Sequence, residues 1–313
     1  MSNSGRIERL PSFVELGGDW LPRLVLVPEL GGMIRQIEFI REGRPFPVLH
    51  DDSDEELVAN PWFRGRFLFP FNDRIPDGKY TWDDVQYQLE INEERDAIHG
   101  FLYRQSMERI SSSKSPSAQW IRLFYQTDGT HPGYPFLLKL VITYQVSPDR
   151  VDIQVDIKNT GKTSAPLTFG WHPYFSLPGT KKIDDVILTI PASKYAETDA
   201  RFCATGVLRS VENTRYDFRK GRNLGEYDYD MFLACPSGWA SLETPFCMLR
   251  IEFNGELLKG FQLFVPPDRT SVALEPVTAP ANTFNHPELG LIALGPGKSI
   301  SSQIHLAMYF KET

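Results

Sequence analysis

The chain lacks the features of an exported, membrane-spanning or metal-binding protein. Its 313 residues include three cysteines (Cys203, Cys235 and Cys247), an odd number without the spacing of a metal site. It has no Asn-x-Ser/Thr sequon, and its polar start, MSNSGRIERL, lacks the apolar segment of a signal peptide. No apolar run approaches the ~20 residues of a membrane span. These absences predict a cytoplasmic protein with reduced thiols.

The charge pattern is equally restrictive. The 40 Asp and Glu residues outnumber the 33 Lys and Arg residues, and no long basic run occurs. This argues against a nucleic acid or an anionic membrane as the main partner. The six histidines form neither a His-x-His nor a His-Glu-x-x-His pattern, so we expect no metal site. A small molecule remains as the expected partner, and the sequence leaves monomer and homodimer open.

The dominant hydrophobic period is two, which is the period of a half-buried strand. In RVDIQVDIKN, the apolar residues Val151, Ile153, Val155 and Ile157 alternate with polar ones. LKLVITYQV is apolar enough to predict a strand covered on both sides. Turn signals such as PDGKY and FNGE separate such segments.

The chain shows no long amphipathic helix and no linker. DDSDEELV predicts one short helical turn, with Asp or Ser as its cap. Many strands, few short helices and no linker predict an all-β fold, a single domain over residues 1–313 built as one large antiparallel β-sandwich or barrel.

His172 is the first candidate for chemistry, in the segment TFGWHPYFSLPG. A lone histidine among aromatic residues is commonly a packed residue. However, Pro173 biases His172 to an extended backbone and ends regular pairing, so the side chain can reach a cleft at a strand end. The ordinary pKa of histidine also suits proton transfer near neutral pH.

Glu275 is the second candidate, in VALEPVTAPANTFN. The alternation predicts that this carboxylate ends an apolar strand, just before Pro276. It could be an ordinary surface residue, but an acid and a base on separate strand ends could also converge on one ligand. Two weaker candidates are His99, followed by the permissive Gly100, and Arg74, a fork of donors for hydroxyl or anionic groups.

Taken in order, the segments FNDRIPDGKYTWDDVQYQL, IHGF, GYPFLLKLVITYQV, FGWHPYFSLPG, YDYDMFL, LEPVTAPANTFN and LGPGKSI resemble the aldose 1-epimerase (galactose mutarotase-like) family. The resemblance extends from about Pro22 to Tyr309. It implies a large antiparallel β-sandwich, an isomerase of carbohydrate metabolism and no cofactor.

The resemblance also implies roles for single residues. Arg74 and His99 would bind sugar hydroxyls, His172 would be the general acid at the ring oxygen, and Glu275 would be the general base at the C1 hydroxyl. A binding aspartate falls in YDYDMF, where Asp230 is the preferred choice and Asp228 the alternative.

The sequence departs from the family pattern next to these positions. Trp171 and Asp73 stand where many members have Asn, and HGF replaces the more common His-Gly-Gly. These departures predict altered ligand-contacting neighbours, and Trp171 in particular is expected to mark an unusual sugar.

Three other functions remain open. Arg64, Arg66 and Arg104 could serve a hexose 6-phosphate, although the sequence favours their being surface charges. A non-catalytic carbohydrate-binding protein on the same scaffold is the second. Glycoside hydrolysis is the third, and it usually needs two carboxylates, of which only Glu275 stands out.

Overall fold

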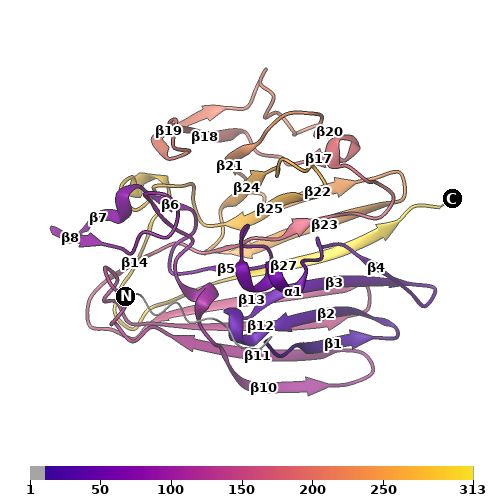
Figure 1. The fold of residues 1–313 in the computed structure, drawn as a ribbon, viewed down its shortest axis with the longest axis horizontal. Helices are drawn as coiled ribbons and strands as arrows, with labels where there is room; N and C mark the ends of the chain where they lie inside the picture. Colours follow the sequence, from indigo (N-terminus) through magenta and orange to yellow (C-terminus); the bar gives the residue numbers. More distant parts are fainter. Residues whose placement is uncertain (1–10, 313) are drawn as a thin grey trace.

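Antiparallel β-sheets make up most of the molecule, as the period-two pattern predicts. The computed structural model describes residues 11–312, and Figure 1 shows its strands in layers. The largest sheet has nine strands, which in spatial order are β10 (Glu108–Lys114), β11 (Gln119–Gln126), β12 (Leu138–Ser147), β13 (Arg150–Asn159), β27 (Ser299–Phe310), β23 (Cys247–Gly255), β22 (Trp239–Glu243), β17 (Ile187–Thr189) and β20 (Arg222–Asn223).

A second sheet packs against the first, and its strands carry two of the candidate residues, Asp230 and Glu275. Its strands, in spatial order, are β19 (Ala204–Ser210), β18 (Lys194–Thr198), β21 (Asp230–Ala234), β24 (Gly260–Phe264), β25 (Val272–Val277), β15 (Gly170–Trp171) and β5 (Phe67–Leu68), with β16 (Tyr174–Phe175) pairing to β25.

Smaller elements complete the fold. A four-stranded sheet contains β1 (Val14–Gly18), β2 (Leu21–Val27), β3 (Met33–Arg41) and β4 (Arg44–Pro47). Three strand pairs are β6 (Arg74–Ile75) with β9 (Ala97–Ile98), β7 (Lys79–Trp82) with β8 (Val85–Gln88), and β14 (Ala165–Leu167) with β26 (Ile292–Leu294). The helical segments are α1 (Asp54–Ala59) and single 3-10 turns at Pro28–Leu30, Pro76–Gly78, Leu102–Arg104, Ile183–Asp185 and Pro287–Leu289.

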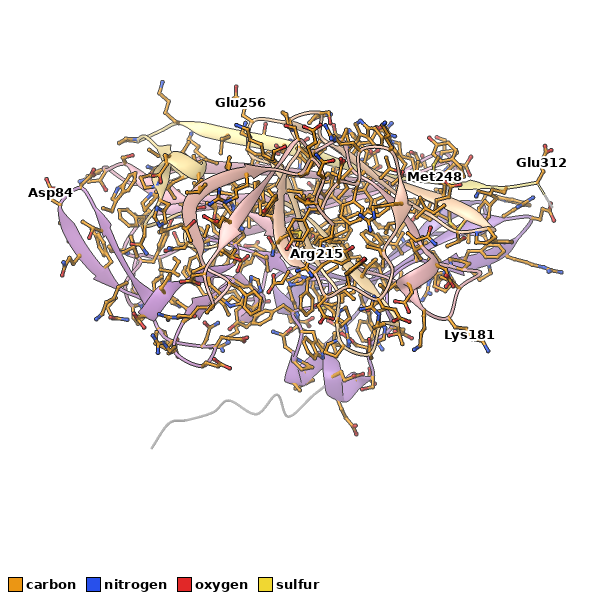
Figure 2. The ribbon with its side chains drawn as sticks, turned by 90° about the horizontal axis from the view of Figure 1, so that it is seen from above. Asp84, Lys181, Arg215, Met248, Glu256 and Glu312 are labelled. Carbon is orange, nitrogen blue, oxygen red and sulfur yellow. The ribbon has the colours of Figure 1, made fainter. Side chains whose placement is uncertain are left out.

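The β7–β8 hairpin and the C-terminal strand mark opposite ends of the molecule. Figure 2 shows Asp84, in the hairpin turn, far from Glu312 at the end of the described chain. The sheets span the distance between these ends, and Figure 1 shows β1 and β2 lying beside β11, β12 and β13. Among residues 11–312, no helix has the length and apolarity needed to cross a membrane.

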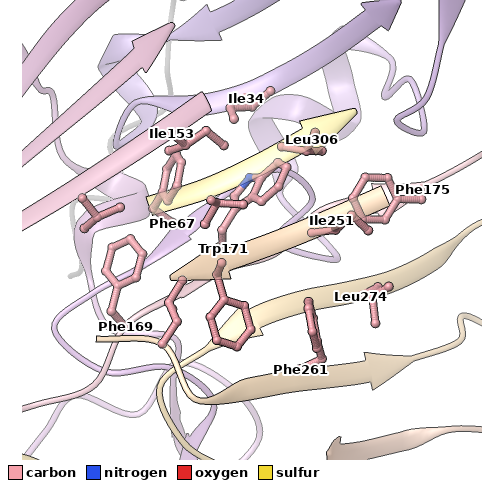
Figure 3. Packing of buried hydrophobic residues seen from close by; sticks show 14 of the residues in the cluster. Ile34, Phe67, Ile153, Phe169, Trp171, Phe175, Ile251, Phe261, Leu274 and Leu306 are labelled. Atoms are coloured by element: carbon pink, nitrogen blue, oxygen red, sulfur yellow. The ribbon is translucent and has the colours of Figure 1, made fainter. Parts of the chain in front are cut away.

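One hydrophobic core fills the space between the sheets. Figure 3 shows Ile153, Ile251 and Leu306 of the nine-stranded sheet facing Trp171 and Leu274 of the second sheet. Because successive side chains of a strand point to opposite faces, residues next to these core positions in sequence point away from the core.

Two local predictions can be compared with the structure directly. Ser53 caps α1 by accepting a hydrogen bond from the backbone N–H of Glu56, whose side chain accepts in return, so the predicted capped turn is confirmed. The expectation that β12 is covered on both sides is wrong, since its buried residues alternate with half-buried ones. Its β-branched outer residues, such as Val141 and Thr143, sit on the solvent side of the sheet.

Candidate active site

A single open cavity brings together all five residues that the sequence selects: Arg74, His99, His172, Asp230 and Glu275. It encloses about 530 Å³, including its mouth. Its wall is completed by aromatic, apolar and polar side chains, namely Pro61, Trp62, Phe63, Asp73, Glu93, Ile98, Tyr174, Gln262 and Phe264.

The pairing of β21, β24 and β25 determines which side chains form the acidic side of the cavity. In β24 and β25, Gln262 lies directly opposite Glu275, while their neighbour Leu274 points into the core. Asp230 begins β21, on the other side of β24, and its Oδ1 accepts a hydrogen bond of 2.7 Å from Gln262 Nε2. Three adjacent strands therefore present three polar side chains to the same face.

His172 occupies the short link between β15 and β16, as the strand-end prediction requires. The backbone N–H of His172 donates to the carbonyl of Arg66 at 2.9 Å, and the backbone carbonyl of His172 accepts from the N–H of Gly65 at 2.8 Å. Its ring stacks on Tyr174 with centroids 5.0 Å apart and an angle of 8°. Its Nε2 lies 3.5 Å from Oε1 of Glu275, so the predicted acid and base are direct neighbours.

Arg74 and His99 enter the cavity from the β6–β9 pair, in which Arg74 is opposite Ile98. His99 has a left-handed backbone (φ 63°), and its Nδ1 accepts a hydrogen bond of 3.1 Å from the N–H of Asp73. The proton of the neutral ring is therefore on Nε2, which remains available as a donor.

Gly100 allows this arrangement, as the sequence indicates. Its φ is +67°, and a Cβ built on it would lie 2.2 Å from the carbonyl oxygen of Phe69. A side chain at this position would push the His99 backbone away from the sheet.

Burial controls the protonation of the central pair. Burial, reinforced by the positive charges of Arg74 and Arg64, lowers the pKa of His172 to about 3. Burial, together with the negative charges of Asp73 and Asp230, raises the pKa of Glu275 well above its usual value. Burial therefore favours a neutral imidazole beside a neutral carboxyl group over an imidazolium beside a carboxylate, and in either arrangement the pair holds one proton.

The pKa values of two other carboxyl groups and of the second histidine of the cavity shift in the same directions as those of the central pair. Burial, with the charge of Asp73, raises the pKa of Asp230 to about 7, although Arg74 opposes this shift. Burial also raises the pKa of Asp73 and lowers that of His99 well below its usual value.

Only one of the two candidate aspartates lies in the cavity. Asp228 has a side chain that is 99% exposed and lies near Arg269, whereas Asp230 lines the cavity.

Two expectations about neighbouring residues are wrong. Trp171 is fully buried, packs against Phe67 and Phe175, and does not line the cavity, because it points to the opposite side of β15 from His172. Glu275 does not end its strand, since β25 continues through Val277 and Glu275 is only 2% exposed.

Two of the three arginines that the sequence offers for a sugar phosphate are buried, contrary to the expectation of surface charges. Arg64 is not a surface charge, because its side chain is 7% exposed and pairs with Asp52 at 2.6 Å. Arg66 is equally buried and donates to the carbonyl of Leu57 at 2.6 Å. Only Arg104 is exposed, and none of the three lines the cavity.

Sequence reasoning missed several cavity residues. Gln262 lies in an ordinary strand pattern, and only its register opposite Glu275 reveals it. Trp62 and Phe63 lie in the segment that follows α1, where no motif marks them. Asp73 is visible as a departure from the family pattern, but its place in the wall is not. Over residues 11–312, no group of three or more His, Cys, Asp or Glu side chains is arranged to hold a metal ion.

Comparison with known proteins gives one consistent result. The family model for aldose 1-epimerase matches residues 22–307. The galactose mutarotase of Rattus norvegicus is 28% identical over 191 residues, which cover 60% of this chain and 54% of that protein. The uncharacterized protein YihR of Escherichia coli is 26% identical over 249 residues, which cover 75% of each. The chain thus spans about half the length of the curated galactose mutarotases it matches.

Solved structures agree on the fold. An aldose epimerase homologue from C. elegans superposes with a TM-score of 0.84 at 21% identity, over 96% of this chain and 99% of that one. A galactose mutarotase-like protein from Clostridium acetobutylicum superposes with a TM-score of 0.85 at 17% identity, over 96% and 95%. At these identities the likeness establishes the architecture of the sheets.

Proposed function

Since this chain belongs to the aldose 1-epimerase family, we propose that it interconverts the α and β anomers of an aldose, with His172 as general acid and Glu275 as general base. The observation that carries the proposal is the 3.5 Å approach of His172 Nε2 to Glu275 Oε1 in the wall of an open cavity. A buried acid–base pair of this kind has little use in a protein that only binds a sugar.

The proposed reaction proceeds by opening the ring. Glu275 takes the proton of the C1 hydroxyl, the bond between C1 and the ring oxygen breaks, and His172 delivers a proton to that oxygen. The free aldehyde then rotates about its bond to C2. Closure reverses both proton transfers and yields the other anomer, so no proton is consumed.

The pKa directions of the pair fit this cycle. Ring opening converts a carboxylate and an imidazolium into a carboxyl group and a neutral imidazole, which is the arrangement that burial favours. The charged arrangement holds the same single proton, and the sugar hydroxyls bound to Glu275 would stabilise it. The two arrangements are thus the two ends of the proposed step.

The remaining polar groups suit a polyhydroxylated ligand. Arg74 supplies guanidinium donors, and His99 supplies the Nε2 proton that its hydrogen bond with Asp73 leaves free. Asp230 supplies acceptor oxygens, held by Gln262. We propose these three residues as the hydroxyl-binding groups of the site.

Saturation-transfer NMR between anomeric signals tests the proposal on several aldoses and their 6-phosphates. We expect exchange faster than in buffer for at least one sugar, and a loss of roughly 10²–10⁴-fold in kcat for His172→Asn and for Glu275→Gln. Asp228→Asn is the matched control, because Asp228 is exposed and outside the cavity.

Two results would count against the proposal in different ways. No exchange above buffer with any aldose would remove the activity. Full activity in either variant, with the thermal unfolding of the variant unchanged, would remove the assigned mechanism while leaving the activity.

A further inference from the structure

A tight turn between β18 and β19 packs against the part of the chain that carries Arg74. The turn comprises residues 199–203, and Oδ1 of Asp199 accepts hydrogen bonds from the N–H groups of Arg201 and Cys203, at 2.8 and 3.0 Å. It belongs to the outer hairpin of the second sheet, whereas Arg74 belongs to the separate β6–β9 pair. The 199–203 turn therefore connects two elements that share no strand pairing.

Arg201 attaches the 199–203 turn to both strands of the β6–β9 pair. Its Nη2 donates to Oδ1 of Asp77 at 3.2 Å and to Oδ1 of Asp96. Asp77 lies in the 3-10 turn that follows β6, and Asp96 directly precedes β9. Because Asp96 is only 6% exposed and also accepts a hydrogen bond of 3.1 Å from the N–H of Asp77, the attachment is more than a mobile surface ion pair.

Asn282 holds the backbone on both sides of this contact. Its N–H donates to the carbonyl of Arg74 at 2.6 Å, and its Nδ2 donates to the carbonyl of Ala204 at 3.2 Å. Ala204 directly follows the 199–203 turn. The position of the turn relative to the backbone of Arg74 is therefore fixed by two independent attachments, those of Arg201 and Asn282.

Phe202 contacts the guanidinium of Arg74 from this turn. Its ring centroid lies 5.7 Å from Cζ of Arg74, within the range of a cation–π interaction. Phe202 has a left-handed backbone (φ 59°), which is strained for a bulky side chain, and it remains 49% exposed. Neither backbone preference nor burial accounts for a phenylalanine here, whereas the contact with Arg74 does.

The carboxylates beside Arg74 hold its guanidinium only loosely. Nη1 lies 3.4 Å from Oδ1 of Asp73 and 3.8 Å from Oδ2 of Asp230, and both distances are longer than an ordinary hydrogen bond. The side chain is 20% exposed, so it loses conformational freedom when it meets a ligand. An aromatic ring that restricts the guanidinium beforehand reduces this loss.

We infer, building on the proposed function, that Phe202 is a positioning residue: its ring, held by the 199–203 turn, orients the guanidinium of Arg74 to donate to the hydroxyl groups of the sugar. Phe202 does not line the cavity, so it acts on the sugar through Arg74. Its effect falls on the affinity for the sugar rather than on proton transfer, which His172 and Glu275 perform.

Steady-state rates from saturation-transfer NMR test the role of Phe202. Phe202→Leu keeps an apolar side chain but removes the ring, so KM should rise by about two- to fivefold, the effect of a partly exposed cation–π contact, with little change in kcat. Phe202→Tyr, which retains a ring, should restore the parent KM. Phe13→Leu is the matched control, because Phe13 is 40% exposed, has its ring centroid 4.7 Å from Cζ of Arg35, and lies outside the cavity.

A double-variant cycle shows whether Phe202 acts through Arg74. In the Arg74→Gln background, Phe202→Leu should change KM by less than about twofold, because no guanidinium is left to orient. Equal effects in both backgrounds would mean that Phe202 contacts the sugar itself and would overturn the inference. A parent-like KM in Phe202→Leu would overturn it as well.

A measurement without sugar separates this inference from the proposed function. The Nε–Cζ signal of Arg74, recorded by carbon-detected NMR and identified by its loss in Arg74→Gln, reports the surroundings of the guanidinium. We expect Phe202→Leu to shift and broaden this signal, whereas Phe202→Tyr and Phe13→Leu should leave it in place. If no aldose is epimerised, the proposed function fails, and this spectrum still decides the inference: an unchanged Arg74 signal in Phe202→Leu overturns it.

Discussion

At the scale of a single residue, Asp230 shows how a buried group of the site affects the stability of the folded protein. Its side chain is 18% exposed, and its one hydrogen bond comes from Gln262. Burial raises its pKa to about 7, above the ordinary value of 3.8. The folded state therefore binds a proton more tightly than the unfolded chain, and its stability depends on the pH.

The sign of this dependence gives a prediction for Asp230→Asn. The contribution of Asp230 to stability is fully present below pH 3.8 and is lost as the pH rises through about 7. The variant should match the parent protein near the acid end and exceed it above pH 7, by on the order of 1–3 kcal/mol. Urea unfolding at several pH values measures the difference, and a constant difference across the range would show that the buried charge of Asp230 is not its source.

Single residues also show where sequence reasoning succeeds and where it fails. His172 and Glu275 are recognisable because each interrupts an apolar strand pattern with a group that can transfer a proton. Trp171 is misread, because its direction depends on which face of β15 meets the core. Gln262 carries no signal in the sequence, since only the pairing of β24 with β25 puts it beside Glu275.

At the scale of elements, the segment after α1 forms one wall of the cavity. The capping box fixes the start of α1, and Asn60 ends it in a left-handed conformation. Pro61, Trp62 and Phe63 follow directly and line the cavity. Trp62 is 37% exposed and stacks on Phe264 with centroids 6.1 Å apart, so its ring forms part of the mouth.

Trp62→Ala tests the contribution of this wall. We expect a roughly fivefold rise in KM with little change in kcat, because about 1 kcal/mol of apolar contact is lost far from the reacting bond. Trp20→Ala is the matched control, since Trp20 is 82% exposed in the β1–β2 turn and does not line the cavity. A drop in kcat with an unchanged KM would show that Trp62 acts on the chemistry instead.

Elements of the large sheets are the part of the structure that the sequence predicts best. The apolar face of β13 is confirmed, with Val151, Ile153, Val155 and Ile157 all buried, although Asp152 on the polar face is buried too. The buried arginines are not predictable in this way. Arg64 and Arg66 appear as charges in a loop, and only the folded partners Asp52 and Leu57 explain their burial.

At the scale of the whole molecule, one apolar cluster joins the sheets. It includes Ile34 of the four-stranded sheet, Leu306 of the nine-stranded sheet and Leu274 of the sheet that carries the cavity. The three sheets therefore share their main interior, and the two further clusters hold only four buried residues each. The single domain over residues 1–313 therefore remains our prediction, with this cluster as its physical basis.

Calorimetry tests that prediction. The chain should unfold in one transition, with equal calorimetric and van't Hoff enthalpies. Leu306→Ala should lower the stability by about 2–5 kcal/mol and move the entire transition, because Leu306 packs between the sheets. Two resolved transitions, with only one of them shifted in the variant, would indicate separate domains.

The central claim is that His172 and Glu275 exchange protons with an aldose that opens between them. Saturation-transfer NMR of the α and β anomeric signals, with the parent protein, His172→Asn, Glu275→Gln and Asp228→Asn at equal concentration, tests it most directly. The account predicts exchange well above buffer for the parent protein and for Asp228→Asn, and exchange reduced by roughly 10²–10⁴-fold for the other two. Exchange at the parent rate in His172→Asn or Glu275→Gln would contradict it.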